Sequence, residues 1–323
     1  MAKIVMVGPT GVGKTSLLAA MYPQLRESIH LVPQQKEEES LGHLRDQLGK
    51  LGEGGIKVTD KVITGTSNAQ EFEFDVIHEE QKDMPLKIVD LPGAFYQLGD
   101  GHQAIEQLQD TDVSLWCVDA VALMEKGGGF HEQINSPKAI AKCYTSSQLN
   151  QDHSICIVLM RSEKYEQDNE IQNLFDKFRR VYKTFISQVR ESSSCISKIY
   201  YCSVQTTGNL RFNHNDGNDT YNPEFIRHQG REYAPSGCEA PVLCAIKRCL
   251  EAGTGKALAD IQKIVDEYFP FTRWLPFLPG HAEYKSRLAT AIRLNEMLER
   301  KINPEIEKLL SADDADRRFF EWQ

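Results

Sequence analysis

The sequence lacks any run of about 18 apolar residues, the length that a membrane-spanning helix requires. It also lacks an excess of basic residues, since 37 Lys and Arg stand against 46 Asp and Glu, for a formal net charge of −9. This charge balance would attract neither nucleic acid nor an anionic lipid surface. The chain opens on a strand-like pattern rather than a signal peptide. We therefore expect a cytoplasmic protein with no integral membrane segment and no nucleic acid partner.

The eight cysteines include no CxxC pair, and no group of His and Cys has the spacing of a metal site. Scattered cysteines of this kind are typical of reduced thiols that pack in a core. With 323 residues, of which 41% are hydrophobic, the chain is long enough to bury a large core. One large domain with an appendage and two separate domains are both compatible with this length.

The strongest motif in the chain is a phosphate-binding loop. The apolar run at 3–7 is typical of a buried parallel strand, and residues 15–22 have helical spacing. Between them, residues 8–15 read GPTGVGKT and match GxxxxGK[ST] in full. In such a loop the backbone N–H groups surround phosphate oxygens, the lysine reaches the outer phosphates and the final hydroxyl binds Mg²⁺. The residues expected to bind the phosphates are Gly8, Thr10, Gly11, Val12, Gly13, Lys14, Thr15 and Ser16.

A second apolar run, LKIV at 86–89, leads into Asp90 and the sequence DLPG. An aspartate at the carboxyl end of a strand beside the phosphate loop binds Mg²⁺ directly or through water, so we expect Thr15 and Asp90 to be metal ligands. Gly93 would donate its N–H to the terminal phosphate. ATPases more often carry a Glu directly after this Asp, whereas Leu91 follows here.

Two later strands end in residues that could read a nucleotide base. The strand expected at 154–160 ends in MRSE, and KIYYCS at 198–203 runs into a polar turn. The Arg161 side chain can stack on a purine, and the Glu163 carboxylate can accept two hydrogen bonds from guanine. Ordinary surface charges at the end of a strand are an alternative interpretation, and Lys164 offers a second register.

In their order along the chain, GPTGVGKT, DLPG, MRSE and CSVQ resemble the nucleotide-binding motifs of a Ras-like (TRAFAC-class) GTPase domain. The chain is most similar to the bacterial double-GTPase-like domains of conflict and signalling systems, over roughly residues 1–252. The family's [NT]KxD is replaced here by MRSE. The resemblance implies GTP or GDP with Mg²⁺ as cofactors, and a backbone N–H near Ser203 and Val204 beside the guanine carbonyl.

The fold implied is α/β, that of P-loop NTPases, in which a mostly parallel sheet carries helices on both faces and binds nucleotide at the carboxyl ends of its strands. The apolar runs independently predict strands at 3–7, about 70–78, 86–90, 113–119, 155–160 and 198–203. We place a P-loop GTPase-like domain at 1–252, with its last helix at 241–252, and a helical C-terminal extension at 253–323.

The interval between Lys14 and Asp90 is longer than a minimal GTPase needs. Residues 33–55 have the pattern of a charged amphipathic helix that ends in glycines, which we interpret as an insertion. The resemblance implies that a threonine just before the strand at 70–78 completes the Mg²⁺ shell when the third phosphate is present. Thr66 is the first choice and Thr64 the reserve, although both could simply begin the strand.

The residue that positions the attacking water is not evident. Many members of the family follow DxxG with Gln, but Ala94 follows Gly93 here. Gln97 and His102 lie nearby, and solvated loop residues are the plainer interpretation of both. We therefore expect slow intrinsic hydrolysis that a partner or self-assembly accelerates. The candidate catalytic residues are Lys14, Thr66, Gly93 and Gln97.

The remaining segments indicate partners rather than chemistry. The polar run at 206–241 would be a loop that closes over the base, meets a partner or has no role. Apolar residues at helical spacing predict helices at 258–268 and 284–310, and GTGK at 253–256 lacks the strand that a phosphate loop needs. Aromatic residues would dock this extension on the core or bind another subunit. They are Phe271, Trp274, Phe277, Phe319 and Trp322.

The sequence therefore predicts a Mg²⁺-dependent GTP-binding molecular switch with weak hydrolysis. Its switch loops and C-terminal helices would control a protein partner or effector subunit, with a nucleotide-dependent oligomer as a further option. Two alternatives stay open. One is an ATP-binding P-loop NTPase, which the departures in MRSE favour, and the other is a non-catalytic nucleotide-binding interaction module.

Overall fold

The computed structural model describes residues 2–53, 57–59, 68–78, 81–97, 101–125, 130–215, 221–228, 230–267, 281–310 and 319–322. Its strands are β1 (Ala2–Val7), β2 (Leu31–Pro33), β3 (Val58–Thr59), β4 (Gln70–His78), β5 (Gln81–Asp90), β6 (Val113–Asp119), β7 (His153–Met160), β8 (Ile196–Ser203), β9 (Leu210–Asn215), β10 (Pro223–Arg227) and β11 (Phe319–Glu321). Its helices are α1 (Lys14–Ile29), α2 (Gln35–Lys50), α3 (Ala94–Gln97), α4 (His102–Leu108), α5 (Ala120–Met124), α6 (His131–Asn135), α7 (Pro137–Ser146), α8 (Glu163–Gln167), α9 (Ile171–Ser192), α10 (Glu239–Glu267), α11 (His281–Met297), the π-helix η3 (Leu298–Ile302) and α12 (Asn303–Leu310).

The main sheet has the strand order β11-β8-β7-β6-β1-β5-β4-β2. Its five central strands, from β8 to β5, pair in parallel, whereas β4, β2 and β11 join through antiparallel pairs. Each strand predicted from the apolar runs is present, and the sheet is mostly parallel, as predicted. The parallel strands all end at one edge of the sheet, so the segments that follow them meet there.

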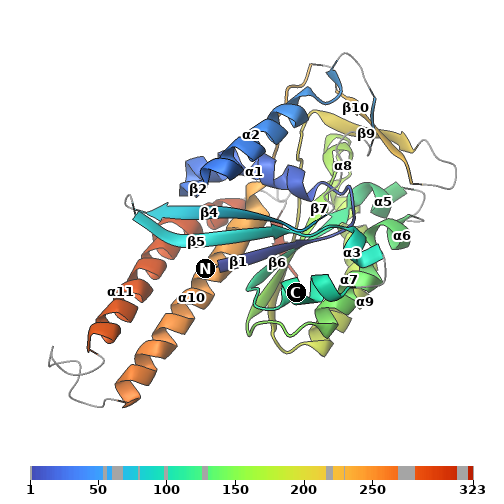
Figure 1. The fold of residues 1–323 in the computed structure, drawn as a ribbon. Coiled ribbons are helices and arrows are strands. Elements are labelled where there is room, and N and C mark those ends of the chain that lie inside the picture. The colour runs from blue at the N-terminus through green and yellow to red at the C-terminus, as the bar shows by residue number, and fades with distance from the viewer. Residues whose placement is uncertain are drawn as a thin grey trace.

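Helices cover both faces of this sheet (Figure 1) because the strand side chains alternate between two apolar cores. In β1, Ile4 and Met6 belong to a core shared with α1, α2 and α10, while Val5 and Val7 face a second core shared with α4, α5, α7 and α9. Both sides of β6 and β7 are fully buried. The predicted α/β fold with helices on both faces is therefore confirmed.

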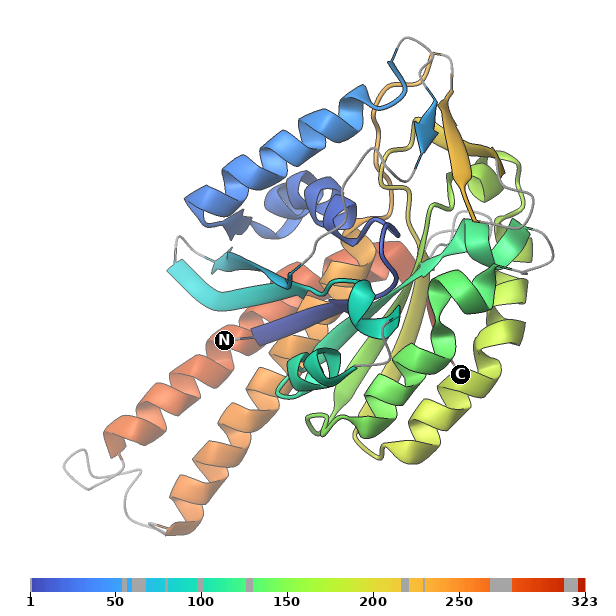
Figure 2. The ribbon, with the colours of Figure 1, turned by 45° about the vertical axis from the view of Figure 1, so that its right-hand side comes forward.

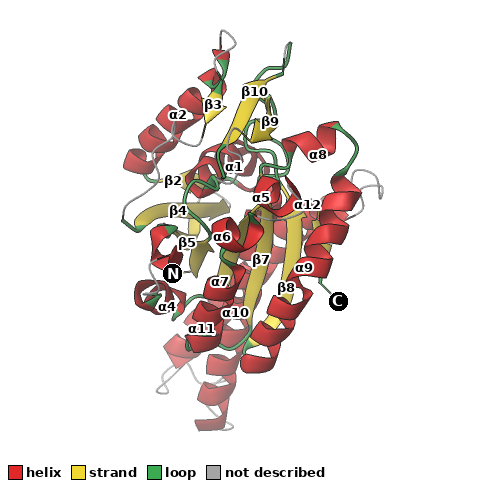
Figure 3. Cartoon of the chain, turned by 90° about the vertical axis from the view of Figure 1, so that its right-hand side faces the viewer, coloured by secondary structure: helices red, strands yellow, loops and turns green. Residues whose placement is uncertain are grey.

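A small second sheet was not expected from the sequence. The polar run at 206–241 contains β9 and β10, which pair with each other and with β3 in the order β3-β10-β9. The prediction of a continuous loop is wrong here, because Leu210, Phe212 and Phe225 are apolar side chains that pack into the core beside α8. Figure 3 shows this sheet beyond the main sheet, at the end where α8 lies.

The C-terminal part of the chain is helical, as predicted, but the helices predicted at 241–252 and 258–268 are not separate. Helix α10 continues from Glu239 to Glu267, so the predicted last helix at 241–252 and the GTGK segment belong to one helix. Helices α10 and α11 form a hairpin that extends past the sheet (Figure 2). The division of the chain at residue 252 stays a prediction, and it falls inside a helix rather than a linker.

From the end of α11 onward, several residues return to the core of the sheet. Met297, Ile302, Ile306 and Phe319 are buried in the core that also contains α1 and α10. Strand β11 then pairs with β8 in antiparallel orientation, with Phe319 opposite Cys202. Phe319 and Trp322 thus dock on the core, while Phe271, Trp274 and Phe277 lie outside the described residues.

Within the described part of the chain, no helix is long and apolar enough to cross a membrane. All eight cysteines are free, and seven of them are buried. The prediction of reduced, packed thiols is confirmed, and burial raises the pKa of most of these thiols, which keeps them protonated and unreactive.

Candidate functional site

The phosphate-binding loop lies between β1 and α1, at the edge where the parallel strands end. Gly13, directly before α1, has φ of 101°, a backbone conformation that favours glycine over other residues. Val12 is buried in the core, so only its backbone can reach a ligand, while Thr10 is exposed. The loop leads directly into α1, whose first N–H groups have no acceptor within the helix. It therefore has the geometry of an anion-binding turn.

Lys14 is buried and curls back over the loop. Its Nζ donates to the carbonyl oxygens of Gly8 and Pro9, each at 3.2 Å, and lies 4.0 Å from Asp90 Oδ1. Burial lowers the pKa of Lys14, and the neighbouring Asp90 charge opposes that change. The ammonium group is thus placed at the mouth of the phosphate-binding loop.

Thr15 and Asp90 come together at the start of α1 and the end of β5. The Thr15 hydroxyl donates to Asp90 Oδ2 at 2.5 Å. Asp90 Oδ1 is buried and accepts no hydrogen bond from the described residues, and burial raises the pKa of this carboxyl. An orphaned carboxylate oxygen beside a hydroxyl is a donor set suited to a hard divalent cation. These two residues fit Mg²⁺.

Gly93 brings the segment after β5 into direct contact with the phosphate-binding loop. A Cβ built on Gly93 would lie 1.9 Å from the backbone N of Thr10 and 2.3 Å from the carbonyl carbon of Pro9. Only glycine can occupy this position without moving the backbone. Ala94 then begins the short helix α3. The predicted neighbourhood of Gly93 and the phosphate site is present.

Arg161, which the sequence placed beside the base, joins three parts of the site. It has φ of 63°, its Nη1 lies 2.9 Å from Asp119 Oδ2, and its Nη2 donates to the carbonyl of Gly11 in the phosphate-binding loop. The guanidinium lies over the Phe225 ring, 5.1 Å from its centroid. Tyr221 also donates to Asp119 Oδ2, at 2.7 Å. This network connects the phosphate loop with β6 and β10.

Glu163 is the first residue of α8 and is 6% exposed. Its Oε1 accepts long hydrogen bonds from Thr207 N and Oγ1, at 3.4 and 3.3 Å. Burial raises the pKa of this carboxyl to about 7. Lys164, the second register, points elsewhere, because its Nζ lies 2.8 Å from Glu125 Oε1. The carboxyl group of Glu163 therefore faces the segment after β8.

The segment after β8 is held by backbone and side-chain hydrogen bonds. Ser203 is fully buried, and its hydroxyl donates to Glu166 Oε1 at 3.3 Å. The N–H of Val204, predicted to meet the guanine carbonyl, instead donates to Leu159 O at 3.1 Å, because the β7–β8 ladder continues for one more residue. In this structure the Val204 N–H is consequently not available to a base.

The remaining predicted residues lie in α1, α3 and α4 or outside the described residues. Ser16 is buried in the first turn of α1, and His102 begins α4 and is exposed. The backbone of Gln97 closes α3, and its side chain lies outside the description. Thr66 and Thr64 also lie outside the described residues. The site also contains residues that the sequence did not predict, and only Asp119, an acid at the carboxyl end of a parallel strand, has a recognisable position. The others are Glu166, Gln205, Thr207, Tyr221 and Phe225.

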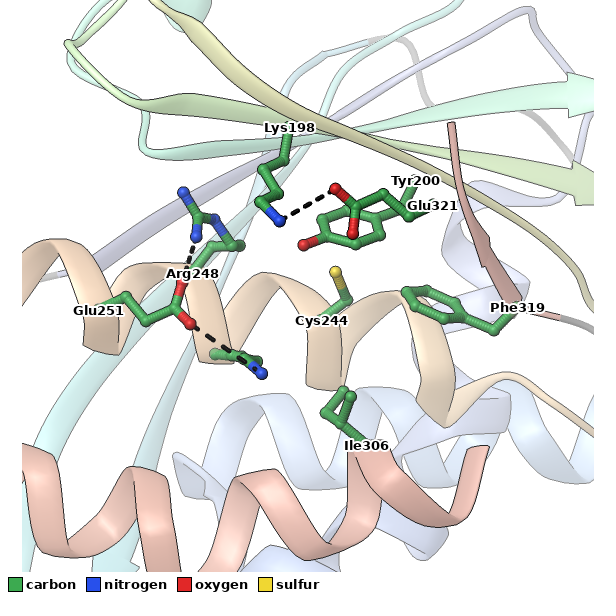
Figure 4. A pocket seen from close by; sticks show the side chains of 9 residues that line it. Lys198, Tyr200, Cys244, Arg248, Glu251, Ile306, Phe319 and Glu321 are labelled. Carbon is green, nitrogen blue, oxygen red and sulfur yellow. Dashed lines mark hydrogen bonds and ion pairs between the residues drawn. The ribbon is translucent and has the colours of Figure 1, made fainter. Parts of the chain in front are cut away.

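A pocket of about 280 Å³ lies away from this site, between α10, β8, β11 and α12 (Figure 4). Its charged side chains are paired with one another, since Lys198 lies 2.9 Å from Glu321 and Arg248 binds Glu251. None of the predicted nucleotide-binding residues lines it. The candidate site is thus the edge where the parallel strands end.

No model of a known protein family matches the chain, and no curated protein matches it. Two crystal structures of the S. cerevisiae Ski7 GTPase-like domain are similar to it, both with a TM-score of 0.35. The one bound to GDP and inorganic phosphate is 15% identical over 62% of this chain and 43% of that chain, and the one bound to GTP is 16% identical over 62% and 42%. The chain therefore spans less than half the length of these proteins, and its fold is assigned from its own strand order and phosphate-binding loop.

Proposed function

We propose that the chain is a Mg²⁺-dependent GTP-binding molecular switch with slow hydrolysis, which controls a protein partner or an assembly. The observation that carries this proposal is the Arg161 bridge. Its guanidinium binds the Gly11 carbonyl, so the residues expected to read the base are fastened directly to the phosphate-binding loop. A nucleotide whose phosphates bind in this loop would therefore bring its base beside Arg161, and the two Ski7 structures contain guanine nucleotides.

At the phosphate end, Lys14 and the loop N–H groups would bind the phosphate oxygens, and Thr15 with Asp90 would hold Mg²⁺. Bound Mg²⁺ supplies charge neutralisation to the phosphates. The Lys14 ammonium group donates to two loop carbonyl oxygens, which are neutral acceptors. These contacts are easily exchanged for phosphate oxygens, since charge-assisted hydrogen bonds are stronger than those to neutral carbonyls.

At the base end, the Glu163 carboxylate would accept from guanine N1–H and the exocyclic amine, with the Arg161 side chain beside the ring. Slow hydrolysis follows from Ala94, whose methyl group cannot orient a water molecule at the position after Gly93. The switch would use Gly93, because a third phosphate in the loop must displace or bind a backbone that already touches Thr10. Thr66 is the proposed second responsive residue.

Two other functions remain candidates because specific residues favour them. Arg161 and Glu163 differ from the Lys and Asp of guanine-specific sites, which favours an ATP-binding P-loop NTPase. The absence of a glutamine after Gly93 favours a non-catalytic nucleotide-binding interaction module. In either case the hairpin of α10 and α11 is the proposed contact for a partner, because it extends past the sheet.

The proposal is tested by denaturing gently purified protein and identifying the nucleotide released, followed by turnover measurements with GTP, ATP and Mg²⁺. We expect the released nucleotide to be a guanine nucleotide. The rate of GTP hydrolysis per protein molecule should be well below about 1 s⁻¹, the lower end of common enzyme rates. Lys14→Ala should weaken nucleotide binding by about 100-fold or more, since a charge-assisted contact is lost. The control Lys138→Ala removes an exposed lysine on α7 and should bind normally. Unchanged binding by Lys14→Ala would show that the site is placed wrongly.

A further inference from the structure

Two carboxyl groups lie one helical turn apart on α8, at the wall of the site that faces the segment after β8. Glu166 is well satisfied: it accepts from the hydroxyls of Ser162 and Ser203, at 2.8 and 3.3 Å, and from the Gln205 amide. Glu163 is more deeply buried, and its charge is supported by its own backbone N–H and by two long hydrogen bonds from Thr207. Hydrogen bonds therefore stabilise the ionised form of Glu166 more than the ionised form of Glu163.

The cations near Glu163 are engaged with other acids. Arg161 pairs with Asp119, and Lys164 pairs with Glu125. No ion pair between Glu163 and a cation is present among the residues that the structure describes. The other titratable groups around Glu163 are Glu166 on its own helix and the buried thiol of Cys238, directly before α10. Those groups are acidic or neutral and disfavour a second negative charge.

Each of these features favours the protonated form of Glu163. Removal of a carboxylate from water raises its pKa, and a nearby like charge raises it further. In this protein burial is the largest cause and Glu166 adds to it, while hydrogen bonds from the backbone N–H of Glu163 and from Thr207 oppose both, so the pKa of Glu163 is raised to about 7. Near neutral pH the two forms of this side chain are therefore comparably populated.

We propose that Glu163 determines base specificity and selects guanine only when it is ionised, so that the nucleotide preference of the site changes with pH near neutrality. This inference deepens the proposed function and rests on it. An ionised carboxylate offers two acceptors to the N1–H and exocyclic amine of guanine. Guanine binding to the protonated protein would release one proton from Glu163 to the solvent.

The protonated carboxyl group presents a different pattern. One of its oxygens becomes an O–H donor, which opposes guanine N1–H but can donate to N1 of adenine, an acceptor. A donor facing a donor in a buried site leaves both groups without a partner, and such mismatches are costly. Protonation should therefore weaken GTP binding and leave ATP binding equal or stronger.

The test is the ratio of GTP to ATP affinity, measured with Mg²⁺ by calorimetry or fluorescent nucleotide binding. The ratio is informative because protonation of the triphosphate, and any titration at Lys14 or Asp90, affects both nucleotides alike. Between about pH 5.5 and about pH 7 the ratio should rise up to tenfold per pH unit, and above about pH 7.5 it should level off. GTP binding near pH 6 should also release close to one proton more than ATP binding, measured in buffers of different ionisation enthalpy.

Three variants separate this effect from others. Glu163→Gln carries a donor and an acceptor at every pH, so its ratio should be low and should not vary with pH. Glu166→Gln removes the neighbouring charge, so the rise in the ratio should move to lower pH. Asp176→Asn removes an exposed carboxyl group on α9 and should leave the curve unchanged.

The two levels of the proposal fail in different ways. If GTP binds in a Lys14-dependent manner but the ratio is constant over this pH range, the role assigned to Glu163 is wrong and the nucleotide site stands. A ratio in Glu163→Gln that still rises with pH would contradict the inference in the same way. If neither nucleotide binds at any pH, the proposed function itself is wrong.

Discussion

The Arg161 side chain connects three segments of the site that are far apart in the sequence. Its partners come from the phosphate-binding loop, from the end of β6 and from β10. Asp119, its acidic partner, is almost fully buried and also accepts from Tyr221 and from the first turn of α5. The arginine therefore neutralises a buried carboxylate and fixes the loop at the same time.

Arg161→Ala should destabilise the protein by about 3 to 5 kcal/mol, because it leaves the Asp119 carboxylate buried without a cation. Chemical denaturation measures this change. The matched control is Tyr221→Phe, which removes one hydrogen bond to the same carboxylate and should cost about 1 kcal/mol. Equal effects of the two variants would mean that the Arg161 charge does not stabilise Asp119.

Glu163 leads to a prediction about stability in the absence of nucleotide. Its pKa is raised from 4.5 to about 7, so the native state favours the protonated form. The corresponding stabilisation is fully present below pH 4.5 and is lost as the pH rises through about 7. Glu163→Gln, which stays neutral, should therefore be more stable than the unsubstituted protein at high pH, by on the order of 3 kcal/mol at about pH 8. The difference in unfolding free energy between the two proteins should fall to near zero at about pH 4.5. Urea unfolding at both pH values measures it, and an equal difference at the two pH values would contradict the prediction.

For single residues, the sequence predicted those whose role is fixed by a motif or strand close to them in the chain. Thr15 and Asp90 were recognisable because a motif fixes one of them and a strand end fixes the other, and the structure places them 2.5 Å apart. Glu166 and Thr207 were not recognisable, because their roles arise from segments that are far apart in the sequence. The Val204 N–H was predicted to be available, but the β7–β8 ladder uses it, and the length of a ladder is a property of both strands.

Among the elements, the segment after β5 is coupled most closely to the phosphate-binding loop. The backbone at Gly93 lies against Pro9 and Thr10 without space for a side chain. The elements on either side are fixed, since β5 is paired on both edges and α3 begins at the next residue. Movement caused by a bound phosphate would therefore be concentrated between Asp90 and α3.

Gly93→Ala should impair GTP binding by about tenfold or more, because its Cβ would overlap Thr10 and force the segment away from the loop. GDP binding should be affected less, since the proposed partner of the Gly93 N–H is the third phosphate, which GDP lacks. Gly42→Ala in α2 is the matched control, because a Cβ there meets no atom within 4 Å. The control should bind both nucleotides normally and gain a few tenths to about 1 kcal/mol of stability from helix propensity. Equal losses of GTP and GDP affinity in Gly93→Ala would contradict a role at the third phosphate.

The strands of the main sheet were predictable because burial on both faces makes them uniformly apolar. The strands β9 and β10 were missed because they alternate a few apolar residues with polar ones inside an Asn-rich run, a pattern also found in loops. The extent of α10 was missed for a different reason. Gly253 and Gly255 resemble a helix end, but the packing of α10 on α11 outweighs their low helix propensity.

For the molecule as a whole, the sheet is completed by a strand from the extension. In β11, Phe319 stacks on Tyr200 with ring centroids 5.4 Å apart, and Phe320 stacks on Tyr201 at 5.1 Å. The extension is thus a structural part of the main sheet as well as a candidate partner surface. Its aromatic residues in β11 cover the edge of β8, which would otherwise present unpaired backbone groups.

Phe319→Ala should reduce the free energy of unfolding by about 3 to 5 kcal/mol, because the side chain is 2% exposed and its removal leaves a cavity. Glu321→Ala, in the same strand, removes a half-exposed side chain and should cost less than about 0.5 kcal/mol. Thermal or urea unfolding measures both variants. Equal stabilities would mean that β11 is not part of the cooperative unit.

The pairing of β11 with β8 has a consequence during protein synthesis. The ribosome makes the chain from the N-terminus, so β8 emerges before the strand that covers its edge, and α10 and α11 are made in the interval. Until β11 appears, the nascent sheet carries an open edge beside the aromatic residues Tyr200 and Tyr201. Open edges of this kind invite pairing with other chains, so a product that ends before Phe319 should aggregate more readily than one that contains β11. Closure of this edge of the main sheet therefore requires translation at least as far as Glu321.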